Sequence, residues 1–334
     1  MKIIHIGDAH IRAQTWANIP RVSGDAYQAC TLVKKHAADH SVDTLLLSGD
    51  VFHSTKPSSE DIRVFNYLIS DFKQVLYIEG NHEKCDPPWL ESFADKRIRQ
   101  LSVVPDTSCG IKIFGIPYSR SSDELKVALN EVSTHEPGPL DILVLHCGFK
   151  HMLNFEGASQ LDATDVEFFP GKVLVSHVHK RRTYKNIHSP GPLFPQNWEE
   201  VGKCYVDLID TATGSIEALD VTVRDYHTVN ADYAGKISAE SSILPPVVRV
   251  LTSDPKQTVP DFDGCIVVPV VSGAGNTKEG TQMKVTGKSI EEAIMDEYSD
   301  QEDGLLMIDL YNSDSPKDII DKLLNDNNIE RRKL

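Results

Sequence analysis

The feature that most constrains the fold of this chain is a series of short apolar runs, each followed at once by polar residues that can bind metals. Five such runs occur in the first two-thirds of the sequence: Lys2–Ile6, Thr44–Leu47, Val75–Ile78, Ile142–Leu145 and Val173–Val175. Short runs of this kind are typical of buried strands. Between them, Asp25–Ala38 and Glu60–Phe72 place apolar residues at helical spacing. The alternation predicts an α/β layered domain.

The residues that follow the five runs form a single chemical set. In order, they are Asp8 and His10, Asp50, Asn81, His146, and His177 with His179. In an α/β sheet, loops at the carboxyl ends of neighbouring strands converge on one crevice, so we expect these side chains to meet. All offer oxygen or nitrogen and none a thiolate, which suits manganese, iron, zinc or magnesium. Gly7, Gly49 and Gly80 precede three of them and are expected to let the backbone turn sharply.

Seven ligands are too many for one metal ion but suit two ions that share a bridging carboxylate. Two divalent ions roughly 3.5–4 Å apart can activate a bridging water and neutralise both oxygens of an in-line phosphoryl displacement. Taken alone, an aspartate such as Asp50 is more often a turn former, and a single histidine is more often structural. The prediction therefore depends on all five clusters arriving in order after buried-looking strands.

The bulk properties exclude several classes of protein. The sequence predicts no membrane span, and Met1–Ile6 runs into Gly7-Asp8 without a signal-peptide cleavage site. Six cysteines without a C-x-x-C pair favour a reduced, intracellular setting. Gly287-Lys288-Ser289 resembles the end of a P-loop, but Gln282 stands where glycine is needed, so an ATPase is not expected. The formal charge of −15 argues against a nucleic-acid binder that acts alone, unless metals, a basic patch or a partner supply positive potential.

The last third of the chain shows a different pattern of predicted elements. Tyr205–Asp220 predicts a hairpin with a Gly-containing turn, and Pro245–Leu251 and Cys265–Val271 predict strands. The Gly-rich segment Ser272–Gln282 predicts a loop. Two helices are predicted to follow, one from the capping-box pattern at Ser289 and one from Ser315-Pro316. The second would carry Ile319, Ile320, Leu323 and Leu324.

The ordered series D-x-H, G-D, G-N-H-[DE], H and H-x-H resembles the calcineurin-like metallophosphoesterases over about Met1–Tyr205. The resemblance implies a β-sandwich flanked by helices, an α/β/β/α fold. It implies that one metal is held by Asp8, His10, Asp50 and His179, and the other by Asp50, Asn81, His146 and His177. Asp50 would bridge the two metals. His82 would not ligate; it would lie over the scissile phosphate and protonate the leaving oxygen or stabilise the transition state.

Two further segments resemble the SbcD-type recombination nucleases. One is Gly49–Ser58; the other is Ser189–Leu193 with the following Trp198-Glu199-Glu200. The resemblance implies a nuclease domain at 1–220, a small α+β cap domain that contacts DNA at 221–285, and C-terminal helices at 286–334. Those helices would dock on an SbcC-like coiled-coil ABC ATPase subunit. Glu83 stands where aspartate is commoner and Ser176 where glycine is usual, but neither change removes a ligand.

The function expected from these features is a two-metal DNA nuclease acting at DNA ends with its ATPase in recombination, repair or replication. The expected activity is that of an exonuclease, and an additional endonuclease activity is left open. The expected metal is manganese, with magnesium, zinc or iron as alternatives. A homodimer and a cytoplasmic setting (the host's, if a phage encodes the chain) are further expectations. Lys180, Arg181, Arg182 and Lys185 would hold the DNA backbone or form a solvated turn. A phosphatase or phosphodiesterase with a non-DNA substrate, and an inactive scaffold, remain alternatives.

Overall fold

The computed structural model describes residues 1–16, 19, 21–83, 89–150, 152, 160–237, 242–253 and 259–271. All of them belong to one unit of the chain, Met1–Val271. The loop predicted at Ser272–Gln282 and the two helices predicted after it lie outside the described residues. Within the part that is described, no helix is both long and apolar enough to cross a membrane.

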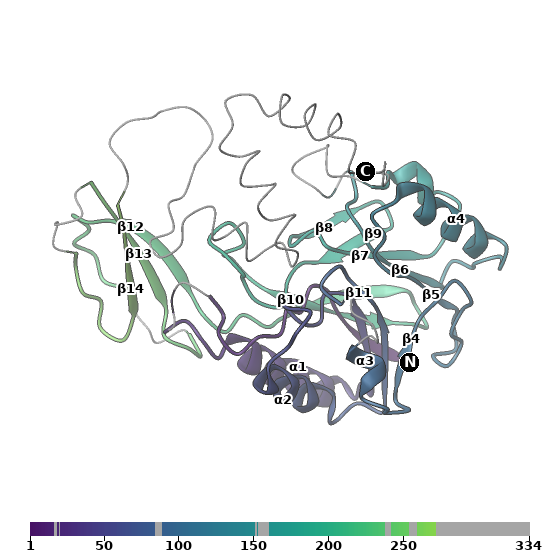
Figure 1. Ribbon diagram of the computed structural model, residues 1–334, viewed down its shortest axis with the longest axis horizontal. Coiled ribbons are helices and arrows are strands. Elements are labelled where there is room, and N and C mark those ends of the chain that lie inside the picture. The colour runs from purple at the N-terminus through teal and green to yellow at the C-terminus, as the bar shows by residue number, and fades with distance from the viewer. Residues whose placement is uncertain are drawn as a thin grey trace, which may run out of the picture. The chain divides into compact units, whose positions relative to one another are not determined.

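Two sheets form the centre of this unit (Figure 1). The first has the order β11-β10-β1-β2-β3-β4, and the second has the order β5-β6-β7-β9-β8. The strands of the first are β1 (Lys2–Ile6), β2 (Thr44–Ser48), β3 (Gln74–Ile78), β4 (Ile98–Gln100), β10 (Tyr205–Asp210) and β11 (Ser215–Asp220). Those of the second are β5 (Ile113–Ile116), β6 (Ile142–His146), β7 (Lys172–Ser176), β8 (Arg181–Tyr184) and β9 (Ile187–Pro190). Strands β1 to β4 run parallel, whereas β10 is antiparallel to both of its neighbours.

Helices pack on the outer face of each sheet. The helices α1 (Asp25–His40) and α2 (Ser59–Ile69) share a core with the first sheet, and α4 (Ser122–Ser133) and the 3₁₀ helix η2 (Ala163–Val166) share one with the second. A short helix, α3, spans Trp89–Ser92. A third core lies between the sheets, where Ile3, Leu46 and Leu76 meet Ile142, Val144 and Leu174. The predicted α/β/β/α sandwich is confirmed.

The five apolar runs are the strands β1, β2, β3, β6 and β7, as predicted. Successive residues of a strand point to opposite faces, so Ile3 faces the other sheet while Ile4 and Ile6 face the helices. This double burial is why the runs show no polar alternation. The five strands are divided between the two sheets of the sandwich, with β1, β2 and β3 in one and β6 and β7 in the other.

The helix boundaries follow local chemistry. Helix α1 extends two residues past the predicted Ala38 and ends where Ser41 adopts a positive φ of 55°. Helix α2 begins after Ser58, whose side chain accepts the Asp61 N–H while Asp61 accepts the Ser58 N–H. This reciprocal capping box satisfies two otherwise unpaired donors at the helix start. Helix α2 ends at Ile69, before the predicted Phe72.

A separate three-stranded parallel sheet follows the sandwich in sequence. It consists of β12 (Tyr226–Asn230), β13 (Val247–Thr252) and β14 (Ile266–Val271) in that order. The strands predicted at Pro245–Leu251 and Cys265–Val271 correspond to β13 and β14, and the predicted hairpin at Tyr205–Asp220 to β10 and β11. The division into domains at 220 and 285 stays a prediction.

Candidate metal centre

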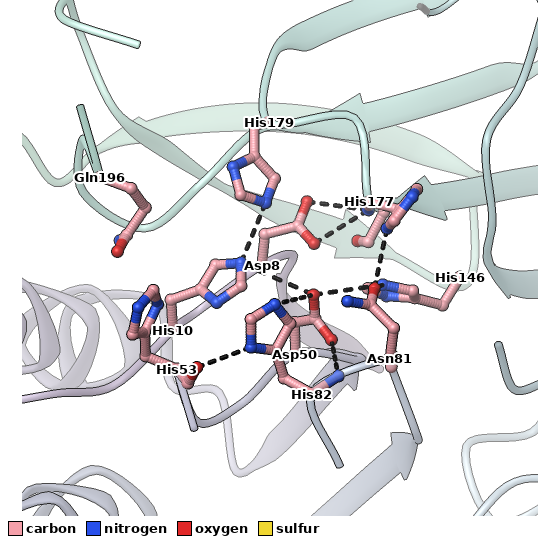
Figure 2. A network of polar contacts seen from close by, with 12 residues as sticks. Asp8, His10, Asp50, His53, Asn81, His82, His146, His177, His179 and Gln196 are labelled. Carbon is pink, nitrogen blue, oxygen red and sulfur yellow. Dashed lines mark hydrogen bonds and ion pairs between the residues drawn. The ribbon is translucent and has the colours of Figure 1, made fainter. Parts of the chain in front are cut away.

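The eight residues singled out by sequence meet at the carboxyl ends of the strands of both sheets (Figure 2). Strands of the first sheet precede five of them: Asp8 and His10 follow β1, Asp50 lies two residues after β2, and Asn81 and His82 follow β3. The second sheet contributes His146 at the end of β6, and His177 and His179 after β7. The two facing sheets thus each supply one side of a single cluster.

The side chains of this cluster form two groups that share Asp50. Potential ligand atoms of Asp8, His10, Asp50 and His179 all lie within 4.8 Å of one another, and so do those of Asp50, His146 and His177. Asn81 belongs with the second group, because its Oδ1 lies 2.9 Å from His177 Nδ1 and 3.2 Å from His146 Nε2. These side chains therefore form two groups of possible ligands that meet at Asp50.

The backbone at the cluster is strained. Asp8, His10, Asp50, His177 and His179 all have φ between 41° and 86°. Side chains other than glycine rarely adopt this region, and such strain, of order 1–3 kcal/mol for each residue, persists mainly where function requires it. Five of the nine such non-glycine residues in the described part of the chain belong to the cluster.

The glycines that precede the ligands serve two different purposes. Gly49 has φ 95°, so the expected sharp turn is present there. At the other two positions the reason is space. A Cβ on Gly7 would lie 2.5 Å from Ser176 Oγ, and one on Gly80 would lie 2.0 Å from Asp50 Oδ1. The expectation that all three glycines serve to turn the chain is therefore corrected for Gly7 and Gly80.

Hydrogen bonds fix the orientation of the candidate ligands. Both carboxylate oxygens of Asp8 accept the His177 N–H, at 2.9 and 3.0 Å. His146 Nδ1 donates to the Ser48 carbonyl at 2.8 Å, and His179 Nδ1 donates to Glu200 at 3.0 Å. Because these Nδ1 atoms carry protons, the Nε2 atoms are the ones that present a lone pair in the neutral rings.

The carboxylates and imidazoles of the cluster shift one another's pKa values. Burial would raise the pKa of Asp50, but the charge and hydrogen bond of His146 and the charge of His10 hold it far below the usual value. Burial would lower the pKa of His146, but the neighbouring carboxylates raise it to about 9. Burial also opposes protonation of His179, yet its bond to Glu200 and the nearby carboxylates raise its pKa to about 9.

The donor set fits two divalent cations. Two carboxylates, one amide oxygen and four imidazoles converge, and burial lowers the pKa of His10 and His177, which keeps those rings neutral. His10 Nε2 and His179 Nε2 lie only 2.9 Å apart, a contact between nitrogens that a shared cation would satisfy. Hard and borderline ligands of this kind are those preferred by manganese, iron, zinc and magnesium.

His82 stands apart from the two groups. Its side chain is 25% exposed, whereas that of Asp50 is 1% exposed. Its Nδ1 donates to the His53 carbonyl at 2.6 Å, and its Nε2 lies 3.9 Å from Asp50 Oδ2. The ring thus lies at the partly exposed rim of the cluster with Nε2 toward Asp50.

Sequence reasoning missed the roles of several residues. Glu83 and Glu200 belong to the recognised motifs, but the motifs do not predict the hydrogen bonds that these residues accept at the cluster. His53 falls within the segment Gly49–Ser58, for which the sequence predicts no role at this position, although the ring lies beside His10 and His82. Of the four cations after His179, Arg181 is ion-paired with Asp207 and Lys185 with Glu167.

Several archaeal proteins that share one name are similar in sequence to this chain. The chain is 24% identical over 195 residues to the DNA double-strand break repair protein Mre11 of Saccharolobus solfataricus, covering 54% of this chain and 50% of that protein. For the protein of the same name from Sulfurisphaera tokodaii the identity is 24% over 198 residues, covering 55% and 50%. For that of Archaeoglobus fulgidus it is 30% over 236 residues, covering 61% and 52%. The chain spans about half the length of these relatives.

The chain also matches the model of a protein family. Residues 1–181 match the family described as calcineurin-like phosphoesterase, which is more than half of the 334 residues. That segment carries every candidate metal ligand from Asp8 to His179, and the chain therefore belongs to the calcineurin-like phosphoesterase family.

Proposed function

We propose that this chain is a two-metal DNA nuclease that hydrolyses phosphodiester bonds at DNA ends. The observation that carries the proposal is the sharing of Asp50 between two ligand groups, with His82 at the rim of both. The name of the relatives, DNA double-strand break repair protein, favours DNA as the substrate. Exonuclease action is the primary activity in this proposal.

Each residue of the cluster has a role in this proposal. Asp8, His10, Asp50 and His179 would hold one cation, and Asp50, Asn81, His146 and His177 the other. When bound, the pair of cations supplies an activated water and neutralises charge on the phosphate. His82 keeps its Nδ1 proton on the His53 carbonyl, which leaves Nε2 to transfer a proton to the leaving oxygen.

Further parts of the proposal concern the metal and partners. Manganese suits the mixture of carboxylate, amide and imidazole ligands. The net charge of −15 means that a partner would supply much of the positive potential for DNA. We therefore propose an SbcC-like ATPase as partner, a DNA-contacting cap at 221–285, docking helices at 286–334, and an intracellular homodimer.

The test is degradation of end-labelled linear duplex DNA by the full chain with manganese, with EDTA, and as the His82→Ala variant. Cleavage should require the metal and should fall by a factor on the order of 10²–10⁴ in the variant, because a general acid is lost. Metal content should be unchanged, since His82 is not a proposed ligand. His40→Ala, a change at the last turn of α1, is the matched control.

Two outcomes would contradict parts of this proposal. Loss of metal from His82→Ala would refute its role as a proton donor outside the ligand sets. Hydrolysis of a small phosphodiester without cleavage of DNA, even with a candidate ATPase added, would favour a phosphodiesterase with another substrate. In the companion variant Asp50→Asn, occupancy of both metals should fall; full occupancy would refute the bridging role.

A further inference from the structure

Unsatisfied polar atoms gather on one flank of the metal-ligand cluster. Four buried atoms there have no hydrogen-bond partner among the described residues: His10 Nδ1, Arg12 Nε, His53 Nδ1 and Gln196 Oε1. Figure 2 shows Gln196, His10 and His53 on the side of the cluster away from His146 and His177. A buried polar atom without a partner costs about 1–3 kcal/mol, so several together need an explanation.

The backbone places Arg12 directly beside this flank. Ile11 and Phe52 form a parallel bridge, with the Ile11 N–H donating to the Val51 carbonyl at 2.8 Å. The His53 N–H donates in turn to the Ile11 carbonyl at 3.3 Å. Arg12 and His53 therefore lie at neighbouring positions of two joined segments, one from the loop after β1 and the other from the loop after β2.

The guanidinium of Arg12 has no anionic partner in the described part of the chain. Its Nη2 donates to the Thr15 carbonyl, a neutral group. The nearest acidic influences are Glu200 and Asp61, but both carboxylates are already engaged. Glu200 accepts from His179, Gln196 and Asn197, and Asp61 accepts from Ala13 and Ser58. A partly buried cation in this position favours an anion as its missing partner.

The donor and acceptor on this flank together indicate the kind of anion. The Arg12 Nε–H suits a non-bridging oxygen of a phosphate, the ligand whose geometry the guanidinium matches best. Gln196 Oε1 can only accept, and it is held in the loop by the Gln196 N–H bond to Glu200 at 2.8 Å. A nucleotide carries both a phosphate and hydrogen-bond donors, so it satisfies both residues.

We propose that Arg12 binds the phosphate next to the scissile one and so positions the substrate strand on the metal centre. This inference rests on the proposed nuclease function. Phosphate contacts fix the register of a nucleic acid without reading its sequence. Arg12 is therefore a substrate-binding residue that sets which phosphate reaches the metals, and it takes no part in proton transfer.

The experiment measures binding of a short fluorescent DNA duplex in manganese, in the His82→Ala background so that the strand stays intact. A methylphosphonate, which removes one phosphate charge, is placed at each position near the end in turn. Arg12→Gln and Arg12→Lys are compared with Arg63→Gln, a control at an exposed arginine that is ion-paired with Glu60 on α2. Metal content of each variant is determined alongside.

We expect one methylphosphonate position to raise the Kd of the parent about tenfold to a hundredfold, the range of a charge-assisted hydrogen bond. Arg12→Gln should weaken binding of unmodified DNA by a similar factor. Its Kd should not change further when the methylphosphonate is placed at that position. The Kd of Arg12→Lys should lie between those of the parent and Arg12→Gln, and the Kd of Arg63→Gln should equal that of the parent. An Arg12→Gln variant that keeps the parent's sensitivity at every position, or that loses metal, would overturn the inference. If the His82→Ala parent does not bind DNA, and the chain with His82 restored does not cleave it, the nuclease function itself is refuted.

Discussion

One buried carboxylate, that of Glu83, joins the loops that carry two candidate ligands. Its Oε2 accepts the N–H groups of Gly80 and Asp50, both at 2.8 Å, and its Oε1 accepts that of Phe52 at 3.1 Å. The residue is 1% exposed. Burial and the charge of Asp50 raise its pKa to about 8. Glu83 thus holds the loop after β2 against the loop after β3, and with it the bridging Asp50.

Replacing Glu83 by glutamine should weaken metal binding. The amide keeps one acceptor oxygen but turns an N–H₂ group toward backbone N–H donors, which misplaces Asp50. Residues that orient metal ligands typically change affinity about 10–100-fold when mutated. The measurement is a manganese titration against a competing chelator. Glu83→Asp introduces the residue that is commoner at this position in the family and should lose less manganese affinity. If Glu83→Gln binds manganese as tightly as the native chain, the proposed role of Glu83 is contradicted.

The cluster of candidate ligands could be predicted from sequence, but the residues that support them could not. Asp8, Asp50 and His146 each follow an apolar run, and that order leaves a pattern along the chain. Glu83 and Glu200 act by accepting hydrogen bonds from groups brought together by folding, which leaves no spacing to recognise. The strained φ angles at the ligands are likewise invisible, because they result from the packing of loops from two sheets.

At the scale of elements, the strands were predictable and their distribution between sheets was not. A run buried on both faces reads the same in either sheet, so the composition of β3 and β6 carries no information about which sheet each joins. The first sheet also includes β10, which returns from late in the chain to pair with β1. A contact between Lys2 and Asp210 spans most of the domain, and local patterns do not specify it.

Strand β10 also carries a buried charge that makes stability depend on pH. Asp207, 1% exposed, accepts from Arg181 Nη1 at 2.7 Å and lies 3.4 Å from His5 Nδ1. Burial would raise its pKa, but the hydrogen bonds and charges of His5 and Arg181 outweigh burial and lower it. Since the folded pKa is below the unfolded one, Asp207 stabilises the fold above the unfolded carboxyl pKa. This contribution is lost as the pH falls through the folded pKa.

We therefore expect Asp207→Asn to lower the free energy of unfolding at pH 7 by about 1–3 kcal/mol. The difference from the native chain should shrink below about pH 4, near the pKa of an unfolded aspartate. Urea unfolding at several pH values, with EDTA present so that metal release does not contribute, measures both. A difference that stays constant down to acid pH would show that packing, and not ionisation, is what the substitution disturbs.

At the scale of the whole described unit, a buried ion pair joins the small sheet to the sandwich. Arg224, just before β12, is 3% exposed and Asp25, at the start of α1, is 0% exposed. Arg224 Nε and Nη2 each donate to Asp25 at 2.9 Å, and Thr15 Oγ1 donates to the same carboxylate at 2.7 Å. Beside this pair, Trp16 stacks on Tyr226, with ring centroids 5.2 Å apart.

The same contact reaches the loops of the metal centre. Trp16 follows His10 and Arg12 in the loop after β1, and its ring meets that of Trp198 edge to face with centroids 4.8 Å apart. Trp198 lies two residues before Glu200, which orients His179. The small sheet is thus attached to the loop that carries Asp8 and His10 and to the segment whose Glu200 orients His179. Its attachment should therefore support the order of these two segments.

Arg224→Met tests whether the small sheet and the sandwich unfold together. Removing one partner of a buried ion pair leaves an uncompensated charge and costs about 3–5 kcal/mol, whereas replacing both partners is far less costly. The Asp25→Asn, Arg224→Met double variant should therefore recover part of the loss. Two of the three tryptophans of the chain, Trp16 and Trp198, lie at this contact, so fluorescence reports on it while circular dichroism reports on the sandwich. Because the Arg224–Asp25 pair joins buried parts of the small sheet and of the sandwich, we expect the fluorescence and circular dichroism transitions in urea to shift together. A shift of the fluorescence transition alone would mean that the small sheet detaches before the sandwich unfolds.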